Sequence, residues 1–191
     1  MLPYRCCLTL TALLLLLTTP LQARVTLVYS SLDADHFRIQ IPDGWKVNVG
    51  REPNPDIRTE QGWIVPRIVT AMPGDDETPL WFGIWVPPDV FTLAGAKQYM
   101  DSLGPVLLSD VTVDKRVTTR LNSLAALHVS GTGFKDKEQM DFHAFFIQLT
   151  PRSIVIAIYI GPPEATDKYG QALAEMIRSI EPATDRREEG Q

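Results

Sequence analysis

The sequence predicts an α+β protein in which an antiparallel sheet of about six or seven strands is flanked by helices, as an α/β/α sandwich. Two segments, 92–104 and 163–180, have the spacing of amphipathic helices, whereas several others alternate or run apolar at strand length. The last two predicted strands, 139–150 and 154–160, are apolar on both faces, so we expect both faces of this pair to be covered.

Composition limits the class of protein. The chain has 191 residues, 45% hydrophobic and 21% charged, which fits one globular domain. Its formal net charge of −5 disfavours a nucleic-acid-binding surface. Both cysteines, Cys6 and Cys7, lie in the segment 1–23 that we expect to be removed as a signal peptide, as argued next. We therefore expect no disulfide and no thiolate metal ligand in the folded domain.

The first 23 residues are typical of a secretory signal peptide. Arg5 supplies the positive start, and the apolar run 6–17 is shorter than the about 20 residues that a membrane span needs. We expect a signal peptide at 1–23, one domain at 24–181 and a disordered tail at 182–191. The processed protein would be periplasmic or secreted, with no stable membrane insertion; an uncleaved anchor is the alternative.

The first half of the chain contains four predicted strands: 37–41, 45–49, 63–70 and 80–86. A turn at 42–44 joins the first two, and the turn signal at 73–76 joins the last two. Pro66 cannot donate a backbone hydrogen bond, which favours an edge position or a bulge for its strand.

The two predicted helices have clear boundaries. Thr92 can cap the first helix, and Gly104-Pro105 can end it. The second helix starts near Pro163 and places its apolar residues on one face over four turns. These residues are Ala165, Tyr169, Ala172, Leu173, Met176, Ile177 and Ile180.

Four further strands lie between the helices, at 111–121, 125–133, 139–150 and 154–160. The expected turns are Asn122-Ser123, Lys135-Asp136 and Pro151-Arg152. A hairpin centred on Pro151-Arg152 would place Leu149 opposite Ile154. The same register would pair Ile147 with Ile156 and Phe145 with Ile158.

This order of elements resembles the PsbP/Mog superfamily, which includes small exported bacterial domains. The similar segments are an opening strand with a Pro-Asp-Gly-Trp turn at 37–45, a strand with a small-residue end at 126–133, and a terminal helix ending at 176–180. The resemblance spans roughly residues 28–181 and implies an antiparallel sheet sandwiched by helices in an accessory or binding protein. Known members assist photosystem II or bind the Ran GTPase, but no residue here matches a functional motif of either branch.

Tryptophan residues mark a candidate binding site. On the strand 80–86, Trp81, Gly83 and Trp85 share one face, and Gly83 leaves a notch between two indoles. Trp63 would lie nearby if its strand pairs with this one. We expect these four residues to form a ligand or partner groove; core packing under the helix that begins at Thr92 is the alternative.

A metal site is a second hypothesis. With a turn at Lys135-Asp136, His128 lies directly opposite His143, and Asp141 lies two residues further along the same face. These side chains could hold a divalent ion in a hydrolase, whereas the alternative is a polar hairpin rim. A one-residue shift of the turn would destroy the alignment.

The sequence contains no nucleophile elbow and no phosphate-binding or dinucleotide-binding loop. We therefore expect a non-enzymatic accessory or binding protein of the cell envelope that recognises an unidentified protein or a small apolar ligand, with no cofactor, no metal and no nucleic-acid partner. The alternatives are a metal-dependent hydrolase that uses His128, His143 and Asp141, and a structural homodimer; the chain would be a monomer or a homodimer.

Overall fold

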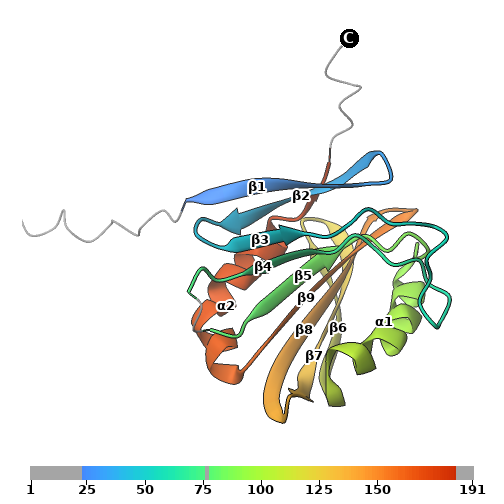
Figure 1. Cartoon of the computed structure of the whole chain (residues 1–191). Coiled ribbons are helices and arrows are strands. Elements are labelled where there is room, and N and C mark those ends of the chain that lie inside the picture. The colour runs from blue at the N-terminus through green and yellow to red at the C-terminus, as the bar shows by residue number, and fades with distance from the viewer. Residues whose placement is uncertain (1–22, 76–77, 184–191) are drawn as a thin grey trace, which may run out of the picture.

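The computed structural model describes residues 23–75 and 78–183 and contains two sheets and two helices. Seven strands form the large sheet in the order β3-β4-β5-β9-β8-β7-β6, and three form a small sheet in the order β1-β2-β10. Every strand pairing among these residues is antiparallel. Figure 1 shows α1 and α2 on opposite sides of the large sheet, with the small sheet across one end. The predicted α+β class is confirmed.

The element bounds are as follows. The large sheet consists of β3 (Lys46–Val49), β4 (Val69–Met72), β5 (Trp81–Trp85), β6 (Ser109–Leu121), β7 (Leu124–Lys135), β8 (Glu138–Thr150) and β9 (Ser153–Gly161). The small sheet consists of β1 (Arg24–Ser31), β2 (Ala34–Pro42) and β10 (Glu181–Pro182). The helices are α1 (Leu93–Leu107) and α2 (Pro163–Arg178).

The two faces of the large sheet differ in their cover. Phe142, Ala144 and Phe146 of β8 point to the side of α1, and we call this side the α1 face. Asp141 points to the opposite side, where its carboxylate accepts a hydrogen bond from Thr166 of α2, and we call this side the α2 face. Neighbouring residues of a strand alternate between these two faces.

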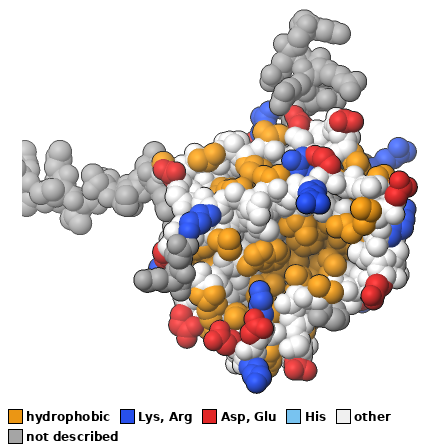
Figure 2. Space-filling view, in the orientation of Figure 1, with side chains coloured by type: hydrophobic (Ala, Val, Ile, Leu, Met, Phe, Trp, Pro, Cys, Tyr) orange, Lys and Arg blue, Asp and Glu red, His pale blue; other side chains and the backbone are white. Residues whose placement is uncertain are grey.

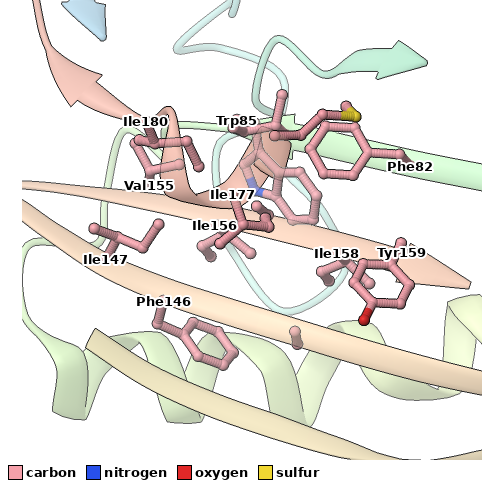
Figure 3. Packing of buried hydrophobic residues seen from close by; sticks show 14 of the residues in the cluster. Phe82, Trp85, Phe146, Ile147, Val155, Ile156, Ile158, Tyr159, Ile177 and Ile180 are labelled. Carbon is pink, nitrogen blue, oxygen red and sulfur yellow. The ribbon is translucent and has the colours of Figure 1, made fainter. Parts of the chain in front are cut away.

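The hydrophobic core lies between the sheet and its covers. Residues Ile154 to Ile158 of β9 are at most 1% exposed, so the centre of the sheet is buried on both sides. Figure 3 shows Phe146 pointing from β8 toward α1. The expectation that the last hairpin is covered on both sides holds for β9.

The β8–β9 register differs from the expected one. Gln148 pairs with Ile154 and Thr150 with Ser153, so Leu149 is an extra residue in a bulge. A one-residue shift moves each side chain to the other face. As a result Ala144 faces Ile158, Phe145 faces Ala157, Phe146 faces Ile156 and Ile147 faces Val155, in place of the predicted pairs.

Helix α1 begins as predicted but continues beyond its predicted end. The hydroxyl oxygen of Thr92 accepts a hydrogen bond from the backbone N–H of Gly95 at 3.1 Å, which confirms the cap. The helix runs through Gly104-Pro105 to Leu107. Leu107 packs against the core and Leu108 is buried, so tertiary packing outweighs the local stop signal.

Three boundaries in the rest of the chain differ from the sequence prediction. The predicted strand 63–70 is strand only from Val69, because the preceding segment is a loop that contacts α1 through Trp63. Strand β1 was not expected. Glu181–Pro182 pairs with β2, so the structured domain extends past the predicted start of the tail. The predicted signal peptide, apart from Ala23, and residues 184–191 of the predicted tail lie outside the described residues.

Candidate functional site

A cavity of about 460 Å³ lies between α1 and the large sheet. Its volume is within the range of small-molecule sites. Figure 2 shows hydrophobic side chains gathered over this part of the surface, with charged side chains around them. The floor is apolar and comes from four strands: Val113 of β6, Leu127 and Val129 of β7, Phe142, Ala144 and Phe146 of β8, and Ile158 and Ile160 of β9.

The floor has a trough because its central side chain is small. Ala144 lies between Phe142 and Phe146 along β8, and only a methyl group stands between the two rings. Directly opposed residues continue this position across the sheet as a row, which we call the Ala144 row: Arg116, Val129, Ala144, Ile158 and Gly83. With about 4.8 Å between neighbouring strands, this row runs about 14 Å along the cavity floor from β6 to β9.

Four charged residues line the cavity besides its apolar floor. Lys97 and Asp101 lie one turn apart on α1, Asp110 lies at the start of β6, and Arg116 ends the Ala144 row at the sheet edge. Within the described part of the chain, none of these side chains makes a hydrogen bond or an ion pair. They are therefore available to a ligand.

The four candidate residues Trp63, Trp81, Gly83 and Trp85 do not form an open groove. Trp81, Gly83 and Trp85 share the α1 face, as the alternation predicts, but Trp85 is 1% exposed. A Cβ atom on Gly83 would lie 2.3 Å from the indole of Trp81, so this ring fills the predicted notch. Trp63 packs edge-on against Tyr99 of α1, with 5.4 Å between ring centroids. The tryptophans form the packed end of the α1 face beside the cavity.

The residues that line the cavity were missed by sequence analysis. The alternation of Phe142, Ala144 and Phe146 is visible in the sequence, and the small residue between two aromatic ones is the signal that could have pointed to a trough. The gap above it depends on where α1 lies, which is a tertiary feature.

On the α2 face, four rings stack across three strands. His128 stacks on Phe145 with centroids 4.3 Å apart, and His143 stacks on Tyr159 at 4.6 Å. Nε2 of His128 and Nδ1 of His143 are 3.0 Å apart, within hydrogen-bond distance. Burial, together with the nearby His143 and Lys115, lowers the pKa of His128 to about 4. Burial also lowers the pKa of His143, although Asp141 opposes this.

The predicted direct pairing of the two histidines is wrong. His128 is opposite Phe145, and His143 is opposite Ser130, because the turn residues with positive φ are Asp136 and Lys137, one position later than expected. The residue opposite His128 therefore shifts by two positions along β8, from His143 to Phe145. Because a shift of two positions keeps the same face, the rings of His128 and His143 still lie on one face and meet as diagonal neighbours. The alignment thus survives the one-residue turn shift that was expected to destroy it.

The metal hypothesis gains no support from this arrangement. Asp141 lies opposite Thr132 and accepts a hydrogen bond from Thr166. In residues 23–75 and 78–183 there is no group of three histidine, cysteine, aspartate or glutamate side chains placed to hold a metal ion.

His128 should make stability depend on pH. Its pKa in the folded state lies below the usual value of about 6.5, so the unfolded chain takes up the proton first as the pH falls. We expect the free energy of unfolding to decrease between about pH 6.5 and pH 4, and less steeply in His128→Phe. Urea unfolding of both proteins across this range measures the difference. Plotted against pH, the unfolding free energies of the unmodified protein and of His128→Phe should run parallel above pH 7. If they also run parallel below pH 6.5, the prediction is contradicted.

A second cavity, of about 470 Å³, lies between the small sheet and the end of α2. Its polar groups largely bond one another: Arg24 pairs with Glu175, and the side chain of Asn122 donates to the backbone oxygen of Arg178. The end of α2 here is the negative end of the helix dipole, which opposes the attraction of the arginines for an anion. The apolar cavity is therefore the better candidate site.

Fold and cavity together define an α/β/α sandwich with a partly open apolar trough on one face. No protein-family model matches the sequence, and no curated protein matches it. Solved structures do match. PsbP (CyanoP) from Synechocystis sp. PCC 6803 gives a TM-score of 0.56 at 8% identity, covering 86% of this chain and 96% of its own.

LpqN of Mycobacterium tuberculosis, whose structure is described as involved in cell envelope biogenesis, gives a TM-score of 0.53 at 11% identity. The match covers 85% of this chain and 91% of LpqN. At such low identity the likeness shows the fold alone, which is PsbP-like. Neither helix of the described residues is long and apolar enough to cross a membrane.

Proposed function

We propose that this protein is an exported, non-enzymatic binding protein of the cell envelope, and that it holds a small apolar ligand in the cavity between α1 and the sheet. The observation that carries the proposal is the mainly apolar cavity at Ala144, whose lining comes from α1 and from four strands of the large sheet. An apolar surface of this kind favours a ligand that removes it from water.

Export and family are part of the same proposal. The N-terminal segment 1–23 has the composition of a signal peptide, and the PsbP-like fold also occurs in LpqN, which is described as involved in cell envelope biogenesis. We propose that the domain belongs to the PsbP/Mog superfamily; the three similar segments and the PsbP-like fold support this assignment.

Binding of the neutral fluorescent probe N-phenylnaphthylamine tests the proposal. Val113 and Val117 lie on the same exposed strand, 46% and 37% exposed, but Val113 lines the cavity while Val117 is opposite His128 on the α2 face. We expect Val113→Arg to weaken probe binding about tenfold or more, because a charged group then occupies the apolar mouth. Val117→Arg is the matched control and should bind as the unmodified protein does.

Two outcomes would refute the proposal. One is a lack of saturable fluorescence enhancement with the unmodified protein at micromolar probe. The other is an equal affinity of the two arginine variants for the probe, which would place the binding site outside the cavity.

A further inference from the structure

Resting on the proposed function, we infer that the ligand is a single-chain amphiphile with an anionic end group, and that Arg116 binds this group while the chain lies along the Ala144 row. The cavity favours an extended chain over a compact ring system because its floor crosses four strands, while the rings of Phe142 and Phe146 flank the Ala144 row.

The position of Arg116 sets the sign of the end group. Arg116 is directly opposite Val129, so its aliphatic stem starts from the apolar floor and its guanidinium group lies at the sheet edge. Among the charged residues that line the cavity, it is the one that belongs to the Ala144 row. A guanidinium group can bind a carboxylate or a phosphate with two parallel hydrogen bonds.

The other charges around the cavity do not reverse this sign. Lys97 and Asp101 are neighbours on one face of α1, so their opposite charges largely offset each other. Asp110 lies further along β6, with Val113 between it and Arg116 on the same face. Asp114 is the unpaired residue of a bulge and does not line the cavity.

The test compares four ligands with the same chain and different end groups, each below the concentration at which it aggregates: dodecanoate, dodecyl phosphate, dodecanol and dodecylamine. Displacement of N-phenylnaphthylamine from the full domain measures each affinity. We expect the two anions to bind about tenfold more tightly than dodecanol, and dodecylamine to bind no better than dodecanol. The ratio of dodecanoate to dodecyl phosphate affinity separates a carboxylate ligand from a phosphate ligand.

Arg116→Gln should lower the affinity for both anions about tenfold and leave the affinity for dodecanol unchanged, which also shows that the variant is folded. Arg116→Lys should restore part of the loss, because the charge returns without the planar group. Arg120→Gln is the matched control: it lies on the same strand and face but does not line the cavity. Its anion affinity should equal that of the unmodified protein.

The failures are distinguishable. If dodecanol binds but Arg116→Gln binds dodecanoate as tightly as the unmodified protein does, the anionic end group is refuted and the apolar site stands. If dodecylamine binds most tightly, the inferred negative charge of the ligand's end group is wrong, and Asp101 and Asp110 determine a preference for a cationic group. If the probe binds in the cavity but none of the four ligands displaces it, the single-chain ligand is refuted and the apolar site stands. If the probe itself does not bind, the proposed function is refuted as well.

Discussion

An Ile156→Ala variant is expected to lose about 2–5 kcal/mol of unfolding free energy. Ile156 is 0% exposed, lies on the central strand β9 and is directly opposite Phe146 on one side and Trp85 on the other. The lost side chain removes apolar contacts and leaves a void that the two large rings hold open. Urea unfolding monitored by circular dichroism measures the loss.

The matched control is Val113→Ala. Val113 is 46% exposed on the edge strand, so its truncation should change stability by less than about 1 kcal/mol. Because Trp85 borders the new void, its fluorescence should also change in Ile156→Ala. A loss similar to that of the control would mean that β9 is not the centre of the core.

Ala144→Leu is expected to weaken binding of N-phenylnaphthylamine by at least about tenfold, and to cost less stability than the same enlargement at a buried alanine away from the cavity. The larger side chain would enter the trough between Phe142 and Phe146 and take the volume that the ligand needs. Probe titration and urea unfolding of the same preparation measure the two effects.

Ala126→Leu is the control for this substitution. Ala126 is 0% exposed on the α2 face, opposite Ile147, and does not line the cavity. The same enlargement there should cost about 1–3 kcal/mol through overpacking. If Ala144→Leu instead destabilised the protein as much as Ala126→Leu and bound the probe normally, the trough would not be the binding site.

The sequence was a good guide to the strands and helices of the second half of the chain. Strands β6 to β9 and helix α2 lie where local alternation and helical spacing predict them, because both patterns follow from burial of one face. Strand β1 was missed although Leu27 and Tyr29 alternate on its inner side, because the apolar Val28 between them obscures the alternation in the sequence.

Strand register was predicted less well, for a physical reason. The bulge at Leu149 and the late turn at Asp136-Lys137 each depend on backbone geometry that residue type specifies weakly. The first error changed the face on which residues of β8 and β9 meet, and the second displaced the histidine pairing along one face. Patterning indicates that a strand exists, whereas its partner is decided at the turn.

The prediction of the candidate binding site was also limited by structure that sequence patterns do not specify. The three residues Trp81, Gly83 and Trp85 were placed correctly on one face, but the open notch was not, because the indole of Trp81 folds back over Gly83. Whether space remains beside a small residue depends on its neighbours. The indole of Trp81 fills the space at Gly83, whereas Ala144 contributes to the lining of the cavity.

The folded-back indole of Trp81 has a consequence for ligand size. It blocks the Ala144 row just beyond Ile158, while the opposite end of the row opens at the edge of the sheet. A chain anchored at that edge extends toward a fixed stop. A ligand chain that is too long must bend or move its end group away from Arg116. A chain that is too short leaves part of the apolar floor in contact with water. The cavity would therefore select ligands by chain length.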